Sequence, residues 1–173
     1  GASAHARENT LEAFQLARKL GATGLESDVW ITADGQAVLD HDGVVRRWWF
    51  FRRRMATVRR DRLPKHVPTL AELYEAVGPV DLSLDVKDAA AFAEVVAVAT
   101  TAGEDALSRL WLCHPDLDVL AGWRDRCRAA KLVHSTRLKR LEGGPERHAA
   151  RLAELGIDVV NLHHTEWTGG LVS

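Results

Sequence analysis

Length, composition and charge already exclude several classes of protein. The chain has 173 residues, with 23 Lys and Arg against 24 Asp and Glu (formal net charge −1), and 46% of its residues are hydrophobic. These values suit one folded domain with a sizeable core and exclude disordered, collagen-like and coiled-coil chains. A membrane-spanning helix is excluded too, because no stretch of about 18 apolar residues is present. Two cysteines, Cys113 and Cys127, are too few for a disulfide scaffold or a four-cysteine metal site.

The first half of the chain predicts a helix, a strand and a hairpin arm. Apolar residues recur at helical spacing from Thr10 to Leu20, and a glycine follows directly. Residues 24–31 read as a short strand, and residues 36–41 as an extended arm that follows it after a turn. The Arg-rich segment from Arg46 to Arg62 fits no pattern and stays unassigned. A further helix is predicted from Thr69 to about residue 77, with a capping box.

Strands and helices alternate regularly from residue 80 onward. Strands are predicted at 80–86, 110–113, 132–135 and 157–162, with helices at 89–101, 115–130 and 145–155. Short connections between such elements indicate parallel strands with right-handed crossovers. We therefore expect an α/β fold in one domain over residues 1–173. Because a complete (β/α)8 barrel has about 250 residues, the fold is predicted to be a partial barrel with about five parallel strands and the arm. An open doubly wound sheet is the alternative.

Two predicted strands carry charged side chains where buried strands are normally apolar. Glu26 and Asp28 alternate with Leu25, Ser27 and Val29, so both carboxylates point to one face. The same alternation places Asp85 and Lys87 on one face of the strand over 80–86. Both acidic positions fall late in their strands, and the reaction site of a barrel lies at the C-terminal strand ends.

If the two strands share a barrel, Glu26, Asp28 and Asp85 converge on one small volume. Two carboxylates about 4 Å apart repel by roughly 4 kcal/mol at an effective dielectric of 20, so such a cluster needs a cation or a shared proton. Oxygen donors without cysteine favour Mg²⁺ or Ca²⁺. Lys87 would then bind an anion together with the metal, and His41, which follows the arm, would transfer a proton. This combination suits hydrolysis of a phosphate ester. Each residue alone also has a purely structural explanation.

The order and spacing of these motifs resemble the glycerophosphodiester phosphodiesterase family. The resemblance rests on residues 8–14 (ENTLEAF), 24–29 (GLESDV), 32–35 (TADG), 41–42 (HD) and 85–87 (DVK), and it covers essentially the whole chain. It implies a TIM barrel of the phosphatidylinositol-phospholipase-C-like type. It also implies metal-dependent hydrolysis of glycerophosphodiesters to glycerol 3-phosphate and an alcohol, with Mg²⁺ or Ca²⁺ as cofactor.

The resemblance also assigns roles to residues of this chain. It implies that Glu26, Asp28 and Asp85 are metal ligands and that His41 is the catalytic acid or base. Lys87 would contact the phosphate of the small-molecule substrate. Arg47 would bind substrate as well, because it stands where the family has an arginine after its His-Asp pair.

Three departures from the family pattern are visible. The family's His-Arg pair on its first strand would lie just before Gly1, and Asp85 replaces the usual glutamate. The family would add two strands beyond Trp167. We therefore expect a piece that lacks the first strand and the last two, and that is at best weakly active although the full-length enzyme is active. Without the N-terminus the compartment is undetermined; cytoplasmic and peripheral-membrane locations both fit.

The Arg-rich segment leaves a further function open. Eight arginines between Arg46 and Arg62 accompany the aromatic run 48–51 against one acid, Asp61. One interpretation is peripheral contact of Trp48–Arg54 with an anionic membrane, which would extend the substrates towards lysophospholipids. The other is a solvated segment with the aromatic rings over the barrel mouth. No nucleic-acid partner is expected. Alternatives to the main prediction are a lysophospholipase D or sphingomyelinase D of the same superfamily, and a non-catalytic anion-binding module.

Three histidines are weaker candidates for the substrate pocket. His114, His134 and His163 each lie at or just past the C-terminal end of a predicted strand. For each, a structural role in the core or rim is the simpler interpretation. Cys113 beside His114 is rejected as a nucleophilic pair, because neighbours in a strand point to opposite faces.

Overall fold

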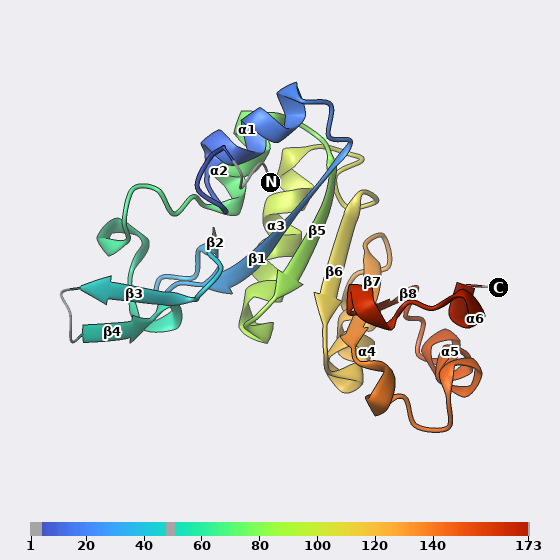
Figure 1. Ribbon diagram of the computed structural model, residues 1–173. Helices are drawn as coiled ribbons and strands as arrows, with labels where there is room; N and C mark the ends of the chain where they lie inside the picture. Colours follow the sequence, from blue (N-terminus) through green and yellow to red (C-terminus); the bar gives the residue numbers. More distant parts are fainter. Residues whose placement is uncertain (1–4, 48–50, 173) are drawn as a thin grey trace. The chain divides into compact units, whose positions relative to one another are not determined.

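The computed structural model describes residues 5–47 and 51–172, which form two compact units, Gly1–Leu110 and Trp111–Ser173 (Figure 1). Both units combine parallel strands with helices, so the predicted α/β class is confirmed. Within the described residues, no helix is both long and apolar enough to cross a bilayer.

The first unit is organised around the parallel pair formed by β1 (Gly24–Ile31) and β5 (Asp81–Val86). The short strand β2 (Ala37–Leu39) pairs antiparallel with the end of β1, as the predicted arm. The helices of this unit are α1 (Leu11–Lys19), α2 (Leu70–Val77) and α3 (Phe92–Ala102), the last preceded by a 3-10 turn at Ala89–Ala91.

Helix caps in the first unit follow directly from the sequence. The Thr10 hydroxyl accepts a hydrogen bond from the Ala13 amide and caps α1. Thr69 and Glu72 form the predicted capping box of α2, which satisfies two amides that the helix itself leaves unpaired. The apolar sides of the helices and strands share one core, whose fully buried members include Phe14, Val29, Leu70, Leu73, Leu82, Leu84, Val86 and Val95.

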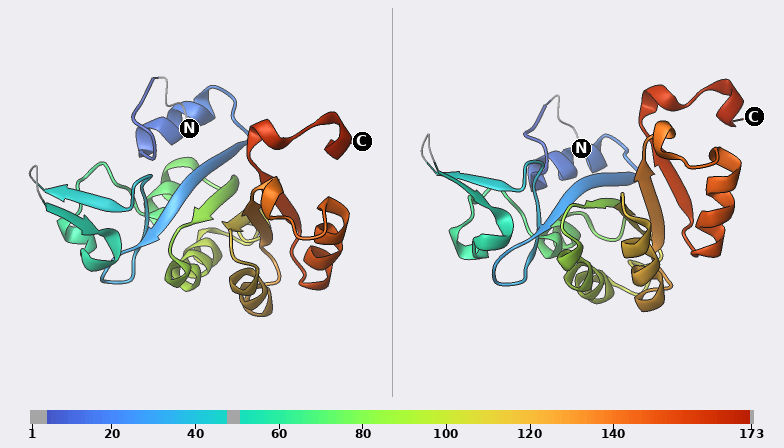
Figure 2. Two further views of the ribbon diagram at one scale, coloured as in Figure 1. Left: turned by 60° about the horizontal axis from the view of Figure 1, so that its bottom comes forward. Right: turned by 90° about the horizontal axis from the view of Figure 1, so that it is seen from below.

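The Arg-rich segment, unassigned from the sequence, forms a second hairpin with its own small core. Strands β3 (Val44–Arg47) and β4 (Phe51–Arg54) pair antiparallel, and 3-10 turns follow at Met55–Thr57 and Arg60–Arg62. The two views of Figure 2 show this hairpin projecting beyond the β1–β5 pair. Its core consists of Val38, Met55, Val58, Leu63 and Val67, with Trp30 and Val45 packed against it.

The second unit contains three parallel strands, β6 (Leu110–His114), β7 (Lys131–Thr136) and β8 (Val159–Leu162), with β7 between the other two. Helices α4 (Leu117–Arg126) and α5 (Pro145–Glu154) connect them, and a short α6 (Gly169–Val172) follows β8. The 3-10 turns of this unit are Leu138–Arg140 and His164–Glu166.

Arg124 determines where α4 ends. The sequence predicts a helix to about residue 130, but α4 ends at Arg126 and Cys127 is extended, with φ −145°. The Arg124 guanidinium donates to the carbonyl oxygens of Cys127, Arg128 and Ala130 at 3.3, 3.0 and 3.1 Å. These bonds give the non-helical carbonyl groups a partner, so the chain turns early into β7.

The same side chain connects this turn to the start of β8. Arg124 Nε donates to the Gly156 carbonyl at 2.7 Å, and the guanidinium pairs with the Asp158 carboxylate. Asp158 in turn accepts from the Leu132 amide at 2.7 Å. Arg124 thereby ties α4, β7 and the segment before β8 together.

Replacing Arg124 should destabilise the chain strongly. We expect Arg124→Ala to lower the free energy of unfolding by about 2–4 kcal/mol, because several carbonyl groups lose a charged donor. Urea denaturation followed by circular dichroism measures this difference. The matched control is Arg128→Ala, an exposed arginine in the same turn, with an expected change below about 0.5 kcal/mol. Equal losses in the two variants would contradict the role of Arg124.

Candidate functional site

The β1–β5 pair brings three carboxylates to one face of the first unit. In the parallel register Asp28 lies directly beside Asp85, and Glu26 lies beside Ser83. Residues in register on neighbouring strands point to the same side, and Glu26 is two positions before Asp28. Asp28 is 9% exposed, whereas Glu26 is exposed to solvent. The sequence therefore predicted correctly that these acids share a face, and the register shows which two are direct neighbours.

Lys87 lies between the two aspartates. Its Nζ is 3.0 Å from Asp28 Oδ1 and also contacts Asp85 Oδ2. Its backbone amide donates to the Val29 carbonyl at 3.1 Å, which extends the pairing of the two strands by one residue. Partial burial acts to lower the pKa of Lys87, but the hydrogen bonds to Asp85 and Asp28 outweigh it, so the pKa is raised. The ammonium group is thus held in its charged form between two carboxylates.

Glu26 responds to the negative charge around it. Desolvation by the surrounding protein and the neighbouring Asp28 raise its pKa, with a smaller contribution from Asp85, while Lys87 acts in the opposite direction. Burial and the two aspartates therefore act on Glu26 in the same direction, and Lys87 opposes them. Three carboxylates and one ammonium group leave the cluster with a net negative charge, which favours binding of a cation.

Hydrogen bonds of Asp40 form a frame that holds the loop after β2. The Asp40 carboxylate accepts hydrogen bonds from the amides of Asp42 and Gly43 at 3.1 and 2.9 Å, and the Asp40 carbonyl accepts from Trp30 Nε1 at 2.8 Å. The Asp40 amide donates to the Asp28 carbonyl at 3.2 Å, which ties the loop to the acidic strand. Gly43 has φ +63°, and a Cβ there would lie 2.3 Å from the Trp30 ring, so only glycine fits.

This frame carries His41 on its outer side. His41 is exposed, and its Nδ1 is 3.1 Å from Asp42 Oδ1. The hydrogen bond to Asp42 is the main reason that the pKa of His41 is raised, and the negative charges of Asp28 and Glu8 add to it. Of the three clustered acids, Asp28 is thus the one whose charge acts on the imidazole.

Asn9 is hydrogen-bonded to β1 on the face opposite to Glu26 and Asp28. Ser27 lies between Glu26 and Asp28 and is fully buried, and its hydroxyl donates to Asn9 Oδ1 at 2.7 Å. Asn9 has φ +53°, a conformation that asparagine tolerates better than most residues. Reasoning from individual residues did not assign this function to Asn9. The signal available was an Asn just before a helix N-cap, where a left-handed residue is plausible.

The acidic cluster fits a hard cation in donor type, but the side chains are arranged around the lysine. Within residues 5–47 and 51–172, no three His, Cys, Asp or Glu side chains are grouped so as to hold a metal ion. Lys87 takes one oxygen each of Asp28 and Asp85, so each carboxylate has a second oxygen for another ligand. Carboxylate oxygens without nitrogen or sulfur are the ligands that Mg²⁺ and Ca²⁺ prefer. Metal binding here remains a prediction.

The other candidate residues are placed less directly. The side chain of Arg47 and the aromatic residues 48–51 lie outside what the structure describes in detail. His114 Nδ1 accepts from the Asp116 amide at 3.0 Å and its ring packs edge-on against Trp123. His163 Nδ1 is 2.8 Å from the Thr165 hydroxyl.

Of the three weaker candidates, His134 is the one that is hydrogen-bonded to another histidine. It is buried, and its Nδ1 is 3.0 Å from His148 Nε2. For His114 and His163 a role in the substrate pocket stays a prediction. His134 belongs to a separate groove of the second unit.

Comparison with known proteins identifies a related family. A family model described as "Glycerophosphoryl diester phosphodiesterase family" matches residues 1–101, more than half of the chain. The glycerophosphodiester phosphodiesterase of Caldanaerobacter subterraneus subsp. tengcongensis is 31% identical over 101 residues, covering 50% of this chain and 42% of the relative. The human glycerophosphodiester phosphodiesterase 1 is 53% identical over 47 residues, 27% of this chain and 14% of the relative. The chain thus spans less than half the length of these relatives.

Solved structures show the same fold. A glycerophosphodiester phosphodiesterase from Thermotoga maritima superposes with a TM-score of 0.77 at 24% identity, covering 94% of this chain and 70% of that one. An Oleispira antarctica phosphodiesterase, solved in complex with its product sn-glycerol-3-phosphate, gives a TM-score of 0.83 at 21% identity, covering 99% and 76%. This likeness confirms the partial (β/α)8 barrel predicted from the sequence.

The close approach of Gly43 to Trp30 can be tested with two glycine substitutions. Gly43→Ala adds a Cβ that overlaps the Trp30 ring, whereas Gly35→Ala has a similar φ of +78° with no atom within 4 Å. We expect Gly35→Ala to lower the free energy of unfolding by about 1 kcal/mol and Gly43→Ala by about 1–3 kcal/mol more. Urea denaturation gives both values. If the two variants lose the same stability, the ring contact does not constrain the loop.

Proposed function

The chain belongs to the glycerophosphoryl diester phosphodiesterase family, and from this we propose that its full-length enzyme hydrolyses glycerophosphodiesters to glycerol 3-phosphate and an alcohol. The observation that carries the proposal is the placement of Asp28, Asp85 and Lys87 side by side at the C-terminal ends of parallel strands. Reaction sites of (β/α)8 barrels lie at that end. The relative from Oleispira antarctica supports the substrate class, since it was solved with sn-glycerol-3-phosphate as its product.

We assign metal binding to the carboxylates of Glu26, Asp28 and Asp85. A bound Mg²⁺ or Ca²⁺ would neutralise negative charge on the phosphate oxygens. Burial raises the pKa of Glu26, and the neighbouring carboxylates of Asp28 and Asp85 raise it further; a cation placed among these oxygens would offset both effects. Asp85 has a shorter side chain than the glutamate expected from the family pattern, so the position of the ion depends on the backbone of β5.

Lys87 binds the substrate phosphate in this proposal. Its charge is maintained by Asp28 and Asp85, and an ammonium group at a strand end is a suitable point contact for a phosphate oxygen. Its hydrogen bonds to the two aspartates restrict where the Nζ can lie. The phosphodiester is thereby oriented relative to the acids that hold the cation.

His41 transfers a proton between the reacting groups. Asp42 raises the pKa of His41 and therefore keeps its ring protonated nearer to neutral pH, which suits donation of a proton to the oxygen of the leaving alcohol. The ring is exposed on the loop that Asp40 anchors to β1, so a bound diester can reach it. We expect the 173-residue chain by itself to be at best weakly active.

The β3–β4 hairpin supports contact with an anionic membrane as an additional part of this proposal. Arg46 lies directly opposite Arg52 in the register, and Arg52, Arg53 and Arg54 are all exposed. Like charges placed opposite each other destabilise a hairpin. Asp42, 3.3 Å from Arg46, offsets part of this repulsion, and an anionic surface would offset more of it. The aromatic residues 48–51 lie between these arginines in the sequence, and such residues are enriched at membrane interfaces.

The proposed activity is tested by release of glycerol 3-phosphate from glycerophosphocholine. In the full-length enzyme, His41→Gln should reduce kcat about 10²–10⁴-fold. Asp85→Asn should lower activity by weakening metal binding, and a chelator should abolish activity until Mg²⁺ or Ca²⁺ is added. Asp81→Asn is the matched control, since Asp81 is an exposed acid at the opposite end of the same strand. Full activity of Asp85→Asn, or activity that a chelator does not affect, would contradict the assigned roles. Release from lysophospholipids or sphingomyelin alone would favour the other superfamily members, and no release of either kind would favour an anion-binding module.

Membrane contact is tested by flotation with vesicles. Arg52→Gln/Arg54→Gln should bind vesicles rich in phosphatidylserine clearly less than the parent chain, since each basic residue near such a surface contributes about 1 kcal/mol. Arg126→Gln/Arg128→Gln removes the same charge elsewhere and should bind as the parent does. No difference between the two double variants would end the membrane interpretation.

A further inference from the structure

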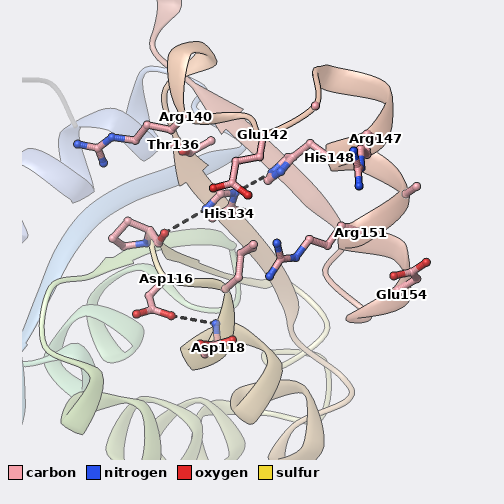
Figure 3. A pocket seen from close by; sticks show the side chains of 14 residues that line it. Asp116, Asp118, His134, Thr136, Arg140, Glu142, Arg147, His148, Arg151 and Glu154 are labelled. Carbon is pink, nitrogen blue, oxygen red and sulfur yellow. Dashed lines mark hydrogen bonds between the residues drawn. The ribbon is translucent and has the colours of Figure 1, made fainter.

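The second unit contains a groove that the proposed function does not use. It has a volume of about 940 Å³ and is lined by residues of α4, α5 and the segments around them (Figure 3). His134 and His148 form part of its wall, together with Arg147 and Arg151 of α5. All these residues belong to Trp111–Ser173, whereas the acidic cluster and His41 belong to the first unit.

The two histidines form a hydrogen-bonded chain with a defined direction. His134 Nε2 lies 3.1 Å from the Pro115 carbonyl oxygen. A carbonyl only accepts, so this nitrogen carries the hydrogen. Both side chains are buried, at 5% and 7% exposure, and burial lowers the pKa of each, which favours the neutral form of both rings. His134 Nδ1 therefore accepts from the Nε2–H of His148 at 3.0 Å.

This arrangement of the two histidines leaves His148 Nδ1 as an acceptor that needs a hydrogen-bond donor. In a neutral ring with its hydrogen on Nε2, His148 Nδ1 is an acceptor. None of the described residues donates to it, and it is not among the fully buried atoms that lack a partner. His148 lines the groove, so this nitrogen offers a lone pair there to a ligand that has a hydrogen to donate.

Two arginines of α5 line the same groove, and one of them, Arg151, acts on His148 electrostatically. Arg147 and Arg151 are four residues apart on α5, and neither forms an ion pair among the described residues. Arg151 contributes to the lowered pKa of His148, which shows that its charge acts on the imidazole. A Cβ at Gly143 would lie 2.4 Å from Arg147 Cδ, so the Arg147 side chain crosses the backbone at that glycine. Figure 3 shows Arg151 reaching from α5 across the groove.

None of the acidic residues that line the groove forms an ion pair with Arg147 or Arg151 among the described residues. The Asp116 carboxylate caps α4 by accepting from the amides of Asp118 and Val119 at 2.9 and 3.2 Å. Glu154 lines the groove at the C-terminal end of α5 (Figure 3). Asp118 and Glu142 also line the wall, without an ion pair to either arginine among the described residues.

We infer that this groove binds an oxyanion that also carries a hydroxyl hydrogen, such as hydrogen phosphate or the phosphate of a hydroxylated monoester. The oxygen atoms of the anion accept from Arg151 and Arg147, and its O–H group donates to His148 Nδ1. An arginine guanidinium matches phosphate oxygens in shape and charge. Sulfate has similar size and charge but no hydrogen at neutral pH, so it cannot satisfy the acceptor nitrogen. An unpaired acceptor buried by the ligand lowers its affinity.

Titration of the 173-residue chain with three anions at constant ionic strength tests this inference. Calorimetry gives the affinities, and nitrogen-15 NMR of the histidine rings reports the bonding of His148 Nδ1. We expect inorganic phosphate to bind about tenfold or more tightly than sulfate and to shift the His148 Nδ1 resonance. The affinity for sn-glycerol 3-phosphate distinguishes the two kinds of ligand. If it binds more tightly than inorganic phosphate, the ligand is a hydroxylated monoester; if it binds more weakly, the ligand is the free anion.

Two arginine variants separate this groove from the site in the first unit. Arg151→Gln should weaken phosphate binding about tenfold, whereas Arg128→Gln, an exposed arginine that does not line the groove, should leave it unchanged. Equal affinities for phosphate and sulfate, no shift at His148, or binding that Arg151→Gln spares and Lys87→Ala abolishes would overturn the inference. The phosphate–sulfate comparison uses the unmodified chain, so it holds even if Arg151→Gln fails to fold.

Discussion

The parallel register between β1 and β5 is the constraint on which the candidate site depends. It places Asp28 beside Asp85, and two neighbouring carboxylates in a half-buried position repel strongly unless a positive charge lies between them. Lys87 supplies that charge, and its backbone amide also extends the pairing of the strands. A shift of one residue would turn the acids to the opposite face, towards the helices. Strand pairing and site chemistry therefore depend on the same alignment.

The balance of charge in this cluster suggests how one set of residues serves both folding and function. The ammonium group of Lys87 pairs with Asp28 and Asp85, while Glu26 forms no ion pair among the described residues. Binding of a cation would relieve that third carboxylate and let the lysine turn towards a phosphate. The stabilising contact and the proposed substrate contact are then two uses of one side chain.

The sequence was sufficient for most of the fold but not for all of the sites. Alternation of apolar and charged residues in β1 and β5 predicted the shared face of Glu26, Asp28 and Asp85, because side-chain direction in a strand follows from position alone. The β3–β4 hairpin escaped prediction because its stability comes from a small core that draws on Val38 and residues 55–67, which lie on both sides of it in the chain. The pairing of His134 with His148, 14 residues apart on a strand and a helix, is set by how α5 packs. No local pattern encodes that contact.

Arg124 has a consequence for how the second unit tolerates change in its sequence. Most of its hydrogen bonds end on backbone carbonyl groups, at positions 127, 128, 130 and 156, and every amino acid presents such a group. Side chains in these turns can therefore drift over evolutionary time without weakening the contacts, whereas the arginine itself has no substitute with the same fork of donors. Homologues should therefore vary in sequence around this turn but retain Arg124.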